Sequence, residues 1–330
     1  MLNKKIAIIG GAGFVGSKLS KYLERLNKHH DIFDVNTPIN REGLFNIDVR
    51  DSNTLDILEG YDCLINLAAE HRDDVRPVNR YDDVNVNGAK NLCNAAEKFN
   101  INTIIFTSSV AIYGFAEPDT DENGEPKYFN DYGRTKFLAE QVYKKWQAKD
   151  KDNRTLVIIR PTVIFGEGNR GNVYNLLNQI ASKKFVMFGN GKNIKSMAYI
   201  DNVIAFIDYT LDFKSGIHIF NYIDKPDLDM NTLVSIVRGR LFKKNNVGLR
   251  LPAFLGIGIG YFVDMIATLF GKTFAISSIR IKKFMKTTQF KSAVRDTDFV
   301  PPITLEDGLN KTIQYEFLED NSDKPMFYTE

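Results

Sequence analysis

The sequence predicts an α/β protein built on a doubly wound parallel sheet, followed by a smaller C-terminal α/β lobe. Three features of the first 165 residues indicate this fold: short runs that are apolar at every position, amphipathic segments between them, and a glycine-rich turn after the first run. Continuously apolar runs suit parallel strands that are covered on both faces. Strand and helix in alternation imply right-handed crossovers within one sheet.

The expected elements follow one another in a regular order. Residues 6–9 form the first strand, and the glycine-rich turn leads from it into a helix over 17–26. Later apolar runs predict strands at 31–34, 63–68, 103–107 and 156–159. Periodic apolar positions predict long helices over 87–99 and 132–148.

The pattern loosens after Arg160-Pro161, where glycines punctuate loops and helices are expected near 173–182, 201–212 and 229–242. We therefore divide the chain into a first domain over 1–165 and a smaller lobe over 166–330, with room for the chain to cross back once or twice. Gly189-Asn190-Gly191 is typical of a hairpin turn. The polar residues from Glu319 onward predict a frayed tail.

Composition narrows the class of protein. Hydrophobic residues make up 43% and charged residues 25% of the chain, which is typical of a folded globular protein. The net charge of +2 lacks the basic excess that nucleic-acid binding usually needs. Cys63 and Cys93 lie in apolar stretches, and the four histidines have no metal-ligand spacing, so we expect buried thiols and no metal site. The first apolar run is too short for a signal peptide, which favours a cytoplasmic protein.

The glycine-rich turn carries the first functional prediction. Gly10, Gly13 and Gly16 follow the first strand and open the first helix. In this arrangement the first glycine permits a tight turn, the second lets the backbone approach a pyrophosphate, and the third lets helix and strand pack. The helix start at Phe14 and Val15 supplies unpaired N–H groups for the phosphates. The turn therefore predicts a dinucleotide-binding, Rossmann-type domain.

Acidic residues refine the cofactor prediction. Asp34 ends the second strand, where its carboxylate can accept hydrogen bonds from the adenosine ribose hydroxyls. A carboxylate there repels a 2′-phosphate, and no arginine follows at 35 or 36, so NAD is favoured over NADP. Asp48 and Val49 follow the next short apolar stretch and are expected to contact the edge of the adenine ring. A helix N-cap at Asp51 or Ser52 also explains the same stretch.

A second constellation predicts proton transfer. Ser109 follows the strand at 103–107, at the carboxyl edge of the sheet where ligands bind in open α/β folds. Tyr132 and Lys136 are four residues apart and share one helix face. We expect the lysine ammonium to lower the pKa of the phenol, so that Tyr132 serves as a base while Ser109 steadies the same substrate oxygen.

The combined motifs resemble the extended short-chain dehydrogenase/reductase family and its sugar epimerase/dehydratase branch. The resemblance covers nearly the whole chain and rests on Gly10–Gly16, Asp34, 66–69, 85–88, Ser108-Ser109, Tyr113-Gly114, Tyr132, Lys136 and Arg160-Pro161. It implies an NAD-binding domain, a C-terminal sugar-binding lobe and a homodimer formed through the helices that begin near Asn87 and Tyr132. It also implies further cofactor contacts at Leu67, Ala68, Ala69, Asn85 and Pro161, and a hold on the nicotinamide ribose by Lys136.

The resemblance implies hydride chemistry at a sugar C4. A 4-epimerase would remove the C4 hydroxyl proton through Tyr132, turn the 4-keto sugar over, and return hydride and proton to its other face. A 4,6-dehydratase of this family carries an Asp-Glu pair just after the strand-end Ser or Thr, whereas this chain has Val110 and Ala111. Dehydration is therefore disfavoured, while 4-keto reduction with exchangeable cofactor stays open.

The substrate prediction is more specific. Val163 stands where nucleotide-sugar epimerases of this branch typically carry an Asn near the diphosphate. The stretches 68–75, 168–174, 195–199 and 224–228 resemble bacterial epimerases that convert GlcNAc to GalNAc on undecaprenyl diphosphate for O-antigen assembly. Candidate substrate contacts, besides Ser109, are His71, Arg72, Arg170, Asn172, Lys195 and Tyr199, with Arg76 as a further cation.

A lipid-linked substrate also requires an apolar surface. Residues 251–270 contain one charged residue, Asp264, and are flanked by Lys243, Lys244, Arg250 and Lys272. Their length approaches that of a membrane span, but Asp264 and three glycines argue against one. We expect a helix lying at the inner face of the cell membrane, with a buried helix or helix pair as the alternative.

The function predicted from these residues is NAD-dependent 4-epimerisation of GlcNAc on undecaprenyl diphosphate. UDP-GlcNAc 4-epimerisation and nucleotide-sugar 4-keto reduction use the same Ser109, Tyr132 and Lys136 and remain alternatives. A non-catalytic NAD-sensing scaffold is a third possibility from another class. An intact proton relay argues against the scaffold, because a sensor does not need one.

Overall fold

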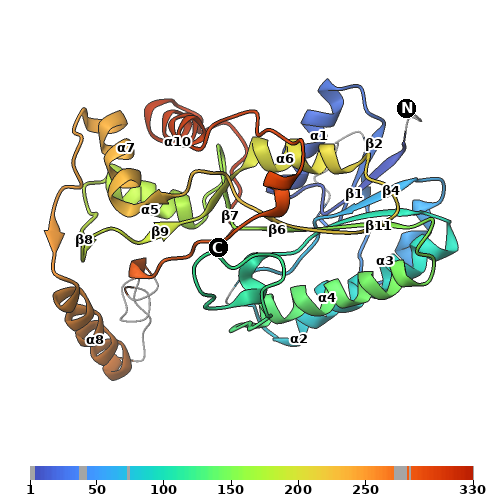
Figure 1. Cartoon of the computed structure of the whole chain (residues 1–330), viewed down its shortest axis with the longest axis horizontal. Coiled ribbons are helices and arrows are strands. Elements are labelled where there is room, and N and C mark those ends of the chain that lie inside the picture. The colour runs from blue at the N-terminus through green and yellow to red at the C-terminus, as the bar shows by residue number, and fades with distance from the viewer. Residues whose placement is uncertain (1–3, 37–42, 73–74, 271–280, 282–283, 330) are drawn as a thin grey trace.

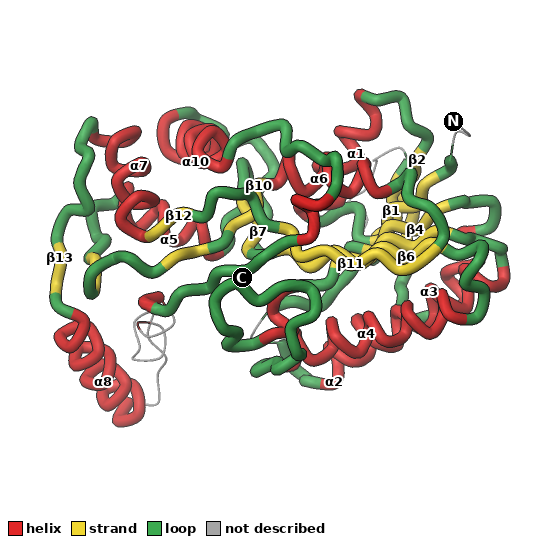
Figure 2. Tube along the Cα trace, viewed as in Figure 1, coloured by secondary structure: helices red, strands yellow, loops and turns green. Residues whose placement is uncertain are grey.

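The computed structural model describes residues 4–36, 43–72, 75–270, 281 and 284–329. A seven-stranded parallel sheet lies at its centre, in the order β11-β6-β5-β4-β1-β2-β3 (Figure 2). The strands are β1 (Ile6–Ile9), β2 (His30–Asp34), β3 (Leu44–Asn46), β4 (Cys63–Asn66), β5 (Thr103–Thr107), β6 (Thr155–Pro161) and β11 (Gly216–Tyr222). The order reverses at β1, whose neighbours are β2 and β4, so a ligand crevice is expected at that edge. The predicted doubly wound fold is confirmed.

Helices cover both faces of the sheet (Figure 1). On one face α3 (Gly88–Lys98) and α4 (Asp131–Ala148) pack on the strands, with α2 (Asn79–Tyr81) nearby. On the other face α1 (Phe14–Arg25) packs beside α6 (Ile200–Thr210). The strand residues are buried in alternation toward these two layers, which is why the predicted runs are apolar at every position.

Two element ends differ from the prediction. β4 ends at Asn66, two residues early, because the Asn66 side chain accepts a hydrogen bond from the Ala68 N–H at 3.1 Å and turns the chain out of the sheet. The helix predicted from residue 17 begins at Phe14. Apolar periodicity is not visible within a single helical turn, so the sequence pattern puts the start of this helix one turn too late.

The C-terminal half contributes to both parts of the molecule. β11 forms the edge of the main sheet and α6 packs on α1, so the chain crosses back into the first domain. The remaining elements build the smaller lobe: β7 (Val163–Phe165), α5 (Asn172–Ala181), β8 (Met187–Phe188), β9 (Ile194–Lys195), β10 (Met197–Tyr199), β12 (Leu228–Asp229), α7 (Met230–Phe242), β13 (Arg250–Leu251), α8 (Ala253–Phe270) and α10 (Leu305–Ile313).

The hairpin predicted at 189–191 is wrong. β8 pairs with β13, and β9 pairs with β12, so the strands that flank this turn do not pair with each other. Gly189 and Gly191 have φ of 78° and 68°, as a glycine turn requires, but the turn leads the chain between two separate small sheets. Turn residues indicate a change of direction and do not specify the pairing of the strands.

Helix α8 projects from the smaller lobe (Figure 1). It is held near its start, where the Gly256 backbone lies so close to Phe188 that an added Cβ would come within 2.5 Å of that ring. Along the part with described side chains, six large apolar residues are exposed: Phe254, Leu255, Ile259, Tyr261, Phe262 and Met265. The alternative of a buried helix is therefore wrong for residues 253–265. Lys272 and residues 73 and 74 lie outside the described residues.

Among the residues that the structure describes, no helix combines the length and the apolar character needed to cross a bilayer.

Candidate active site

The glycine turn after β1 is closed by backbone contacts that exclude side chains. Gly10 has φ of 81°, and its N–H donates to the Phe33 carbonyl at 2.8 Å. A Cβ added at Gly10 would lie 2.6 Å from the Ala68 nitrogen, and one added at Gly16 would lie 2.6 Å from the Gly10 carbonyl oxygen. The loops after β1 and β4 thus meet at the carboxyl edge of the sheet, as the predicted dinucleotide turn requires.

The start of α1 is prepared for an anion. Its N-cap is Gly13, which has no side chain to cap the helix. The first N–H groups of the helix can therefore donate hydrogen bonds to a ligand. Asp34 accepts the Ala12 N–H at 3.0 Å with Oδ2 and the Asn36 N–H at 2.9 Å with Oδ1. This carboxylate therefore also braces the turn. A glycine cradle, free helix amides and an acid at the end of β2 fit the phosphates and adenosine ribose of NAD.

The loop after β4 is held by Asn85, which corrects one sequence prediction. Asn85 was expected to contact the cofactor, but its side chain is buried and its amide donates to the Glu70 carbonyl and to Thr135 Oγ1 at 3.0 and 2.9 Å. Its Oδ1 accepts the Glu70 N–H at 2.8 Å. With both donors used, Asn85 fixes the loop that begins at Leu67 to helix α4, and does not present its amide to a ligand.

The stretch after β3 serves mainly structural contacts. Asp48 forms a bidentate pair with Arg50, and this hydrogen bonding holds the pKa of the Asp48 carboxyl below its usual range. Val49 is buried against Gly88 at the start of α3. The alternative N-cap is present at Asp51, whose side chain accepts the Asn53 N–H at 3.0 Å. An adenine contact by Asp48 and Val49 stays a prediction.

Ser109 and Tyr132 are brought together by a close approach of two helices. Ser109 caps the 3-10 helix Val110–Tyr113, accepting the Ala111 N–H at 3.1 Å. Gly133 lets α4 lie against that helix, because a Cβ there would come within 2.5 Å of the Ala111 carbonyl oxygen. As a result the Ser109 side chain lies near enough to the Tyr132 hydroxyl to act by hydrogen bonding to lower the pKa of the phenol, and the role of the two residues in proton transfer stays a prediction.

The expected lowering of the Tyr132 pKa by Lys136 is wrong. Burial raises the pKa of Tyr132 to about 12, and the hydrogen bond with Ser109 offsets this only in part. Lys136 Nζ lies 5.9 Å from the centre of the Tyr132 ring and donates instead to the Thr107 carbonyl at 2.7 Å. Burial also lowers the pKa of Lys136 to about 7, so its ammonium charge is present in only about half of the molecules at neutral pH and stabilises a phenolate less than a full charge would.

A buried ion pair supports this site and was not predicted from the sequence. Glu140 lies one helical turn after Lys136 and accepts hydrogen bonds from Arg160 Nε and Nη2 at 2.8 and 2.7 Å. Arg160 Nη1 also donates to the Tyr113 hydroxyl at 2.6 Å. The negative charge of Glu140 acts to raise the pKa of Lys136 against the effect of burial. A glutamate on the inward face of α4 is the sequence signal that indicates such a partner.

The predicted substrate residues fall into two groups. His71, Arg72 and Asn172 are exposed, and Lys195 is partly buried, which lowers its pKa to about 8. Tyr199 was expected to touch substrate, but it is fully buried and its hydroxyl donates to Glu167 at 2.9 and 3.0 Å. Tyr199 is therefore a core residue.

Arg170 is also more constrained than predicted. It stacks over Tyr174 with its guanidinium carbon 5.1 Å from the ring centre, and it pairs with the buried carboxylate of Glu316 at 3.7 Å. Its Nη1 donates to the Tyr328 hydroxyl at 3.3 Å. These contacts neutralise the charge that was expected to face a diphosphate, so Arg170 joins the loop to the C-terminal segment.

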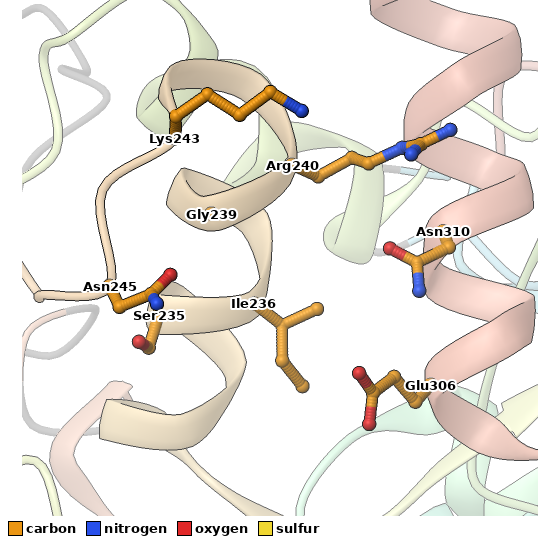
Figure 3. Close-up of a pocket in the computed structure, with 8 residues that line it drawn as sticks. All are labelled: Ser235, Ile236, Gly239, Arg240, Lys243, Asn245, Glu306 and Asn310. Carbon is orange, nitrogen blue, oxygen red and sulfur yellow. The ribbon is translucent and has the colours of Figure 1, made fainter.

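A separate pocket lies between α7 and α10 (Figure 3). It contains none of the predicted site residues, and its lining is mostly polar: Ser235, Ile236, Gly239, Arg240, Lys243, Asn245, Glu306 and Asn310. It lies on helices of the smaller lobe, away from the carboxyl edge of the sheet that carries Ser109 and Tyr132.

Comparison with known proteins supports the reading of this site. A model described as the NAD dependent epimerase/dehydratase family matches residues 6–221. The N-acetyl-alpha-D-glucosaminyl-diphospho-ditrans,octacis-undecaprenol 4-epimerase of Escherichia coli O157:H7 is 46% identical over 338 residues, which cover 100% of both chains. The UDP-glucose 4-epimerase of Vibrio cholerae is 28% identical over 338 residues, covering 97% of each chain.

A solved structure has the same fold. The UDP-glucuronic acid 4-epimerase of Bacillus cereus, in complex with NAD, superposes with a TM-score of 0.70 at 20% identity and covers 94% of this chain and 98% of its own. At this level of identity the likeness concerns the fold alone.

Proposed function

The chain belongs to the NAD dependent epimerase/dehydratase family, and from this premise we propose that it interconverts GlcNAc and GalNAc at C4 while the sugar is attached to undecaprenyl diphosphate. The observation that carries the proposal is the 46% identity, over the full length of both chains, to an epimerase named for that substrate. The enzyme is thus an isomerase that uses NAD as its cofactor.

The side chains of the site can perform the proton transfers of this reaction. Bound NAD supplies a hydride acceptor in the first half of the reaction and a hydride donor in the second. Tyr132 takes the proton from the C4 hydroxyl and later returns it, while Ser109 holds the same oxygen by a hydrogen bond. Burial raises the pKa of Tyr132 to about 12, so the phenol needs a nearby positive charge to act as a base, and Lys136, with its Nζ 5.9 Å from the Tyr132 ring centre, is the residue placed to supply it.

The residues after Ser109 support epimerisation over dehydration. Val110 and Ala111 begin the 3-10 helix where a dehydratase of this family carries an acidic pair. Apolar side chains there provide no acid or base for the loss of water across C5 and C6. The 4-keto intermediate is therefore left to turn over and be reduced from its other face.

The exposed face of α8 supports a lipid-linked substrate. Phe254, Tyr261 and Phe262 have exposed fractions of 71%, 55% and 59%, which is unusual for large aromatic side chains on one helix. Arg250 and the lysines at 243 and 244 precede the helix. An apolar face with basic residues at one end suits the interface of a bilayer with anionic headgroups. We place the enzyme on the inner face of the cell membrane through this helix.

A second exposed apolar feature lies just before the helix that carries Tyr132. Phe115 and Phe129 stack with ring centres 4.8 Å apart and are 53% and 48% exposed. Phe129 precedes the N-cap of the helix that carries Tyr132, and Lys286 Nζ lies 4.7 Å from the Phe115 ring centre. Lys195 Nζ donates to the Lys286 carbonyl at 2.6 Å, so two cationic residues lie beside this aromatic pair. Cations beside aromatics suit the junction of a diphosphate with a hydrocarbon chain.

Helix α8 yields a prediction. Phe262→Asp places a charge on the apolar face of α8 and removes an aromatic side chain that would be buried in the bilayer. Activity on membrane-embedded lipid-linked GlcNAc should therefore fall roughly tenfold or more. Activity on a soluble short-chain analogue should change little, because α8 lies outside the catalytic centre. Val300→Asp is the matched control, since Val300 is 80% exposed and lies outside α8 in the sequence. If a folded variant loses the same activity on both substrates, α8 does not contact the lipid.

The substrate assignment has a direct test. The purified enzyme, supplied with NAD, is incubated with undecaprenyl-diphospho-GlcNAc and, separately, with UDP-GlcNAc, and the released sugars are identified. We expect GalNAc from the lipid-linked substrate. Formation of GalNAc from UDP-GlcNAc alone would replace the lipid with a nucleotide while leaving the C4 chemistry in place.

The assembly of the enzyme is part of the same proposal. We propose a homodimer formed through α3 and α4, in keeping with the family resemblance. Leu138 of α4 is partly buried, belongs to none of the core clusters and provides apolar area for a second copy.

A further inference from the structure

The tail predicted to fray is instead docked. Figure 1 shows the C-terminus near the middle of the molecule, between the main sheet and the elements of the smaller lobe. The Phe327 N–H donates to the Gly168 carbonyl, and the Arg170 N–H donates to the Phe327 carbonyl, both at 2.8 Å. Thr329 Oγ1 donates to Asn169 Oδ1 at 2.8 Å. Residues 325–329, called the C-terminal strap below, are thus paired with the loop over 166–171.

The strap also reaches the cofactor turn. The ring of Phe327 lies against Phe14, with ring centres 5.7 Å apart and planes at 58°. Phe14 is the first residue of α1 and directly follows Gly13, the residue of the turn that lets a pyrophosphate approach. Phe327 therefore joins the loop of the smaller lobe to the phosphate-binding end of the first domain. Phe327 thus contacts residues 168–170 through its backbone and the start of α1 through its ring.

The loop that pairs with the strap is held by a buried carboxylate, that of Glu316. The Gly168 N–H donates to Glu316 Oε1 at 2.8 Å, and the same carboxylate pairs with Arg170 at 3.7 Å. Phe317, next in sequence, stacks on Tyr174 with ring centres 5.7 Å apart. The loop to which the strap binds is therefore rigidly positioned, so displacement of the strap breaks its own backbone bonds and the Phe327–Phe14 contact.

We infer that the C-terminal strap retains the dinucleotide, and that Phe327 is the positioning residue that slows its release. The reaction gives this contact a purpose, because hydride taken from one sugar has to return to that same sugar. Escape of the reduced cofactor while the 4-keto sugar is bound would strand the intermediate. Because the Phe327–Phe14 contact is between two rings, it uses none of the hydrogen-bonding groups of the cradle and acts on the rate at which the cofactor leaves. The inference concerns the cofactor and holds for either sugar carrier.

The test measures release of NAD directly. Enzyme loaded with radiolabelled NAD is mixed with excess unlabelled NAD, and the retained label is followed by rapid gel filtration. Phe327→Ala should raise the dissociation rate at least about tenfold, the factor expected when an apolar contact worth roughly 1.4 kcal/mol is lost. A chain ending at residue 324 should release NAD at least as fast. Phe327→Tyr keeps the ring and should retain NAD nearly as well as the unmodified enzyme.

Controls separate retention from general damage. Asp323→Ala changes an exposed residue just before the strap and should leave the release rate unchanged. Each variant is compared by its melting temperature in the absence of NAD, which a local contact should shift little. If folded Phe327→Ala and the chain ending at 324 both release NAD at the original rate, the strap has no part in retention and the inference is overturned.

Discussion

Tyr132→Phe is expected to lower the rate of epimerisation by about 10²- to 10⁴-fold, the range that a positioned acid or base contributes. The variant keeps the aromatic ring and loses only the hydroxyl that exchanges the C4 proton and bonds to Ser109. NAD binding should persist, because the glycine cradle and the N-terminus of α1 are untouched. Turnover of GlcNAc to GalNAc and the amount of bound NAD are both measured.

Tyr128→Phe provides the matched control for this prediction. Tyr128 lies on the loop just before α4 and is 41% exposed, so loss of its hydroxyl should leave turnover within about twofold of the original. The comparison also distinguishes an enzyme from an NAD-sensing scaffold. A Tyr132→Phe protein that binds NAD and epimerises at the original rate would show that this phenol is not the proton carrier.

The second large effect is on stability. Glu140→Gln should lower the free energy of unfolding by about 3–5 kcal/mol, because it leaves the Arg160 guanidinium charged and buried without its carboxylate. The two side chains are 0% and 4% exposed, so water cannot replace the lost partner. Chemical denaturation followed by circular dichroism measures the change. Helix α4 should also pack less tightly near Lys136, because Glu140 lies one helical turn from that residue.

A double variant and a surface variant test the cause. In Glu140→Gln with Arg160→Met no unpaired charge remains, and part of the lost stability should return. Glu97→Gln removes a partly exposed surface carboxylate that pairs with Lys149 and, at 3.5 Å, with Arg154, and it should cost less than about 1 kcal/mol. A Glu140→Gln protein as stable as the Glu97→Gln protein would mean that the buried pair contributes no more than a surface pair.

The local motifs were predictable because each depends on residues that are near in sequence. The Gly10, Gly13 and Gly16 spacing requires only a strand, a turn and a helix in succession, and the structure has all three. Tyr132 and Lys136 share a helix face through the period of the helix alone. The placement of Ser109 beside Tyr132 followed from the parallel sheet, because the ends of its strands meet at one edge.

Other features depend on contacts between distant segments. The pKa of Tyr132 follows from its burial, which the four-residue spacing to Lys136 does not reveal. Tyr199 and Arg170 were expected to reach substrate, yet each has a carboxylate partner, Glu167 or Glu316, that spacing does not indicate. Polar composition suggested a frayed C-terminus, but its docking depends on Phe327, a single apolar residue whose target is more than 300 positions away.

The sequence by itself determined the parallel sheet and the glycine turn, and it predicted the proton relay, because short-range geometry and periodic burial encode these features. The tertiary structure alone decided that α8 exposes its apolar face, that Glu140 and Arg160 are buried together, and that the C-terminal strap lies on Phe14. The physical reason is that burial and charge pairing are properties of the whole packed chain. They are set by which distant surfaces exclude water from one another.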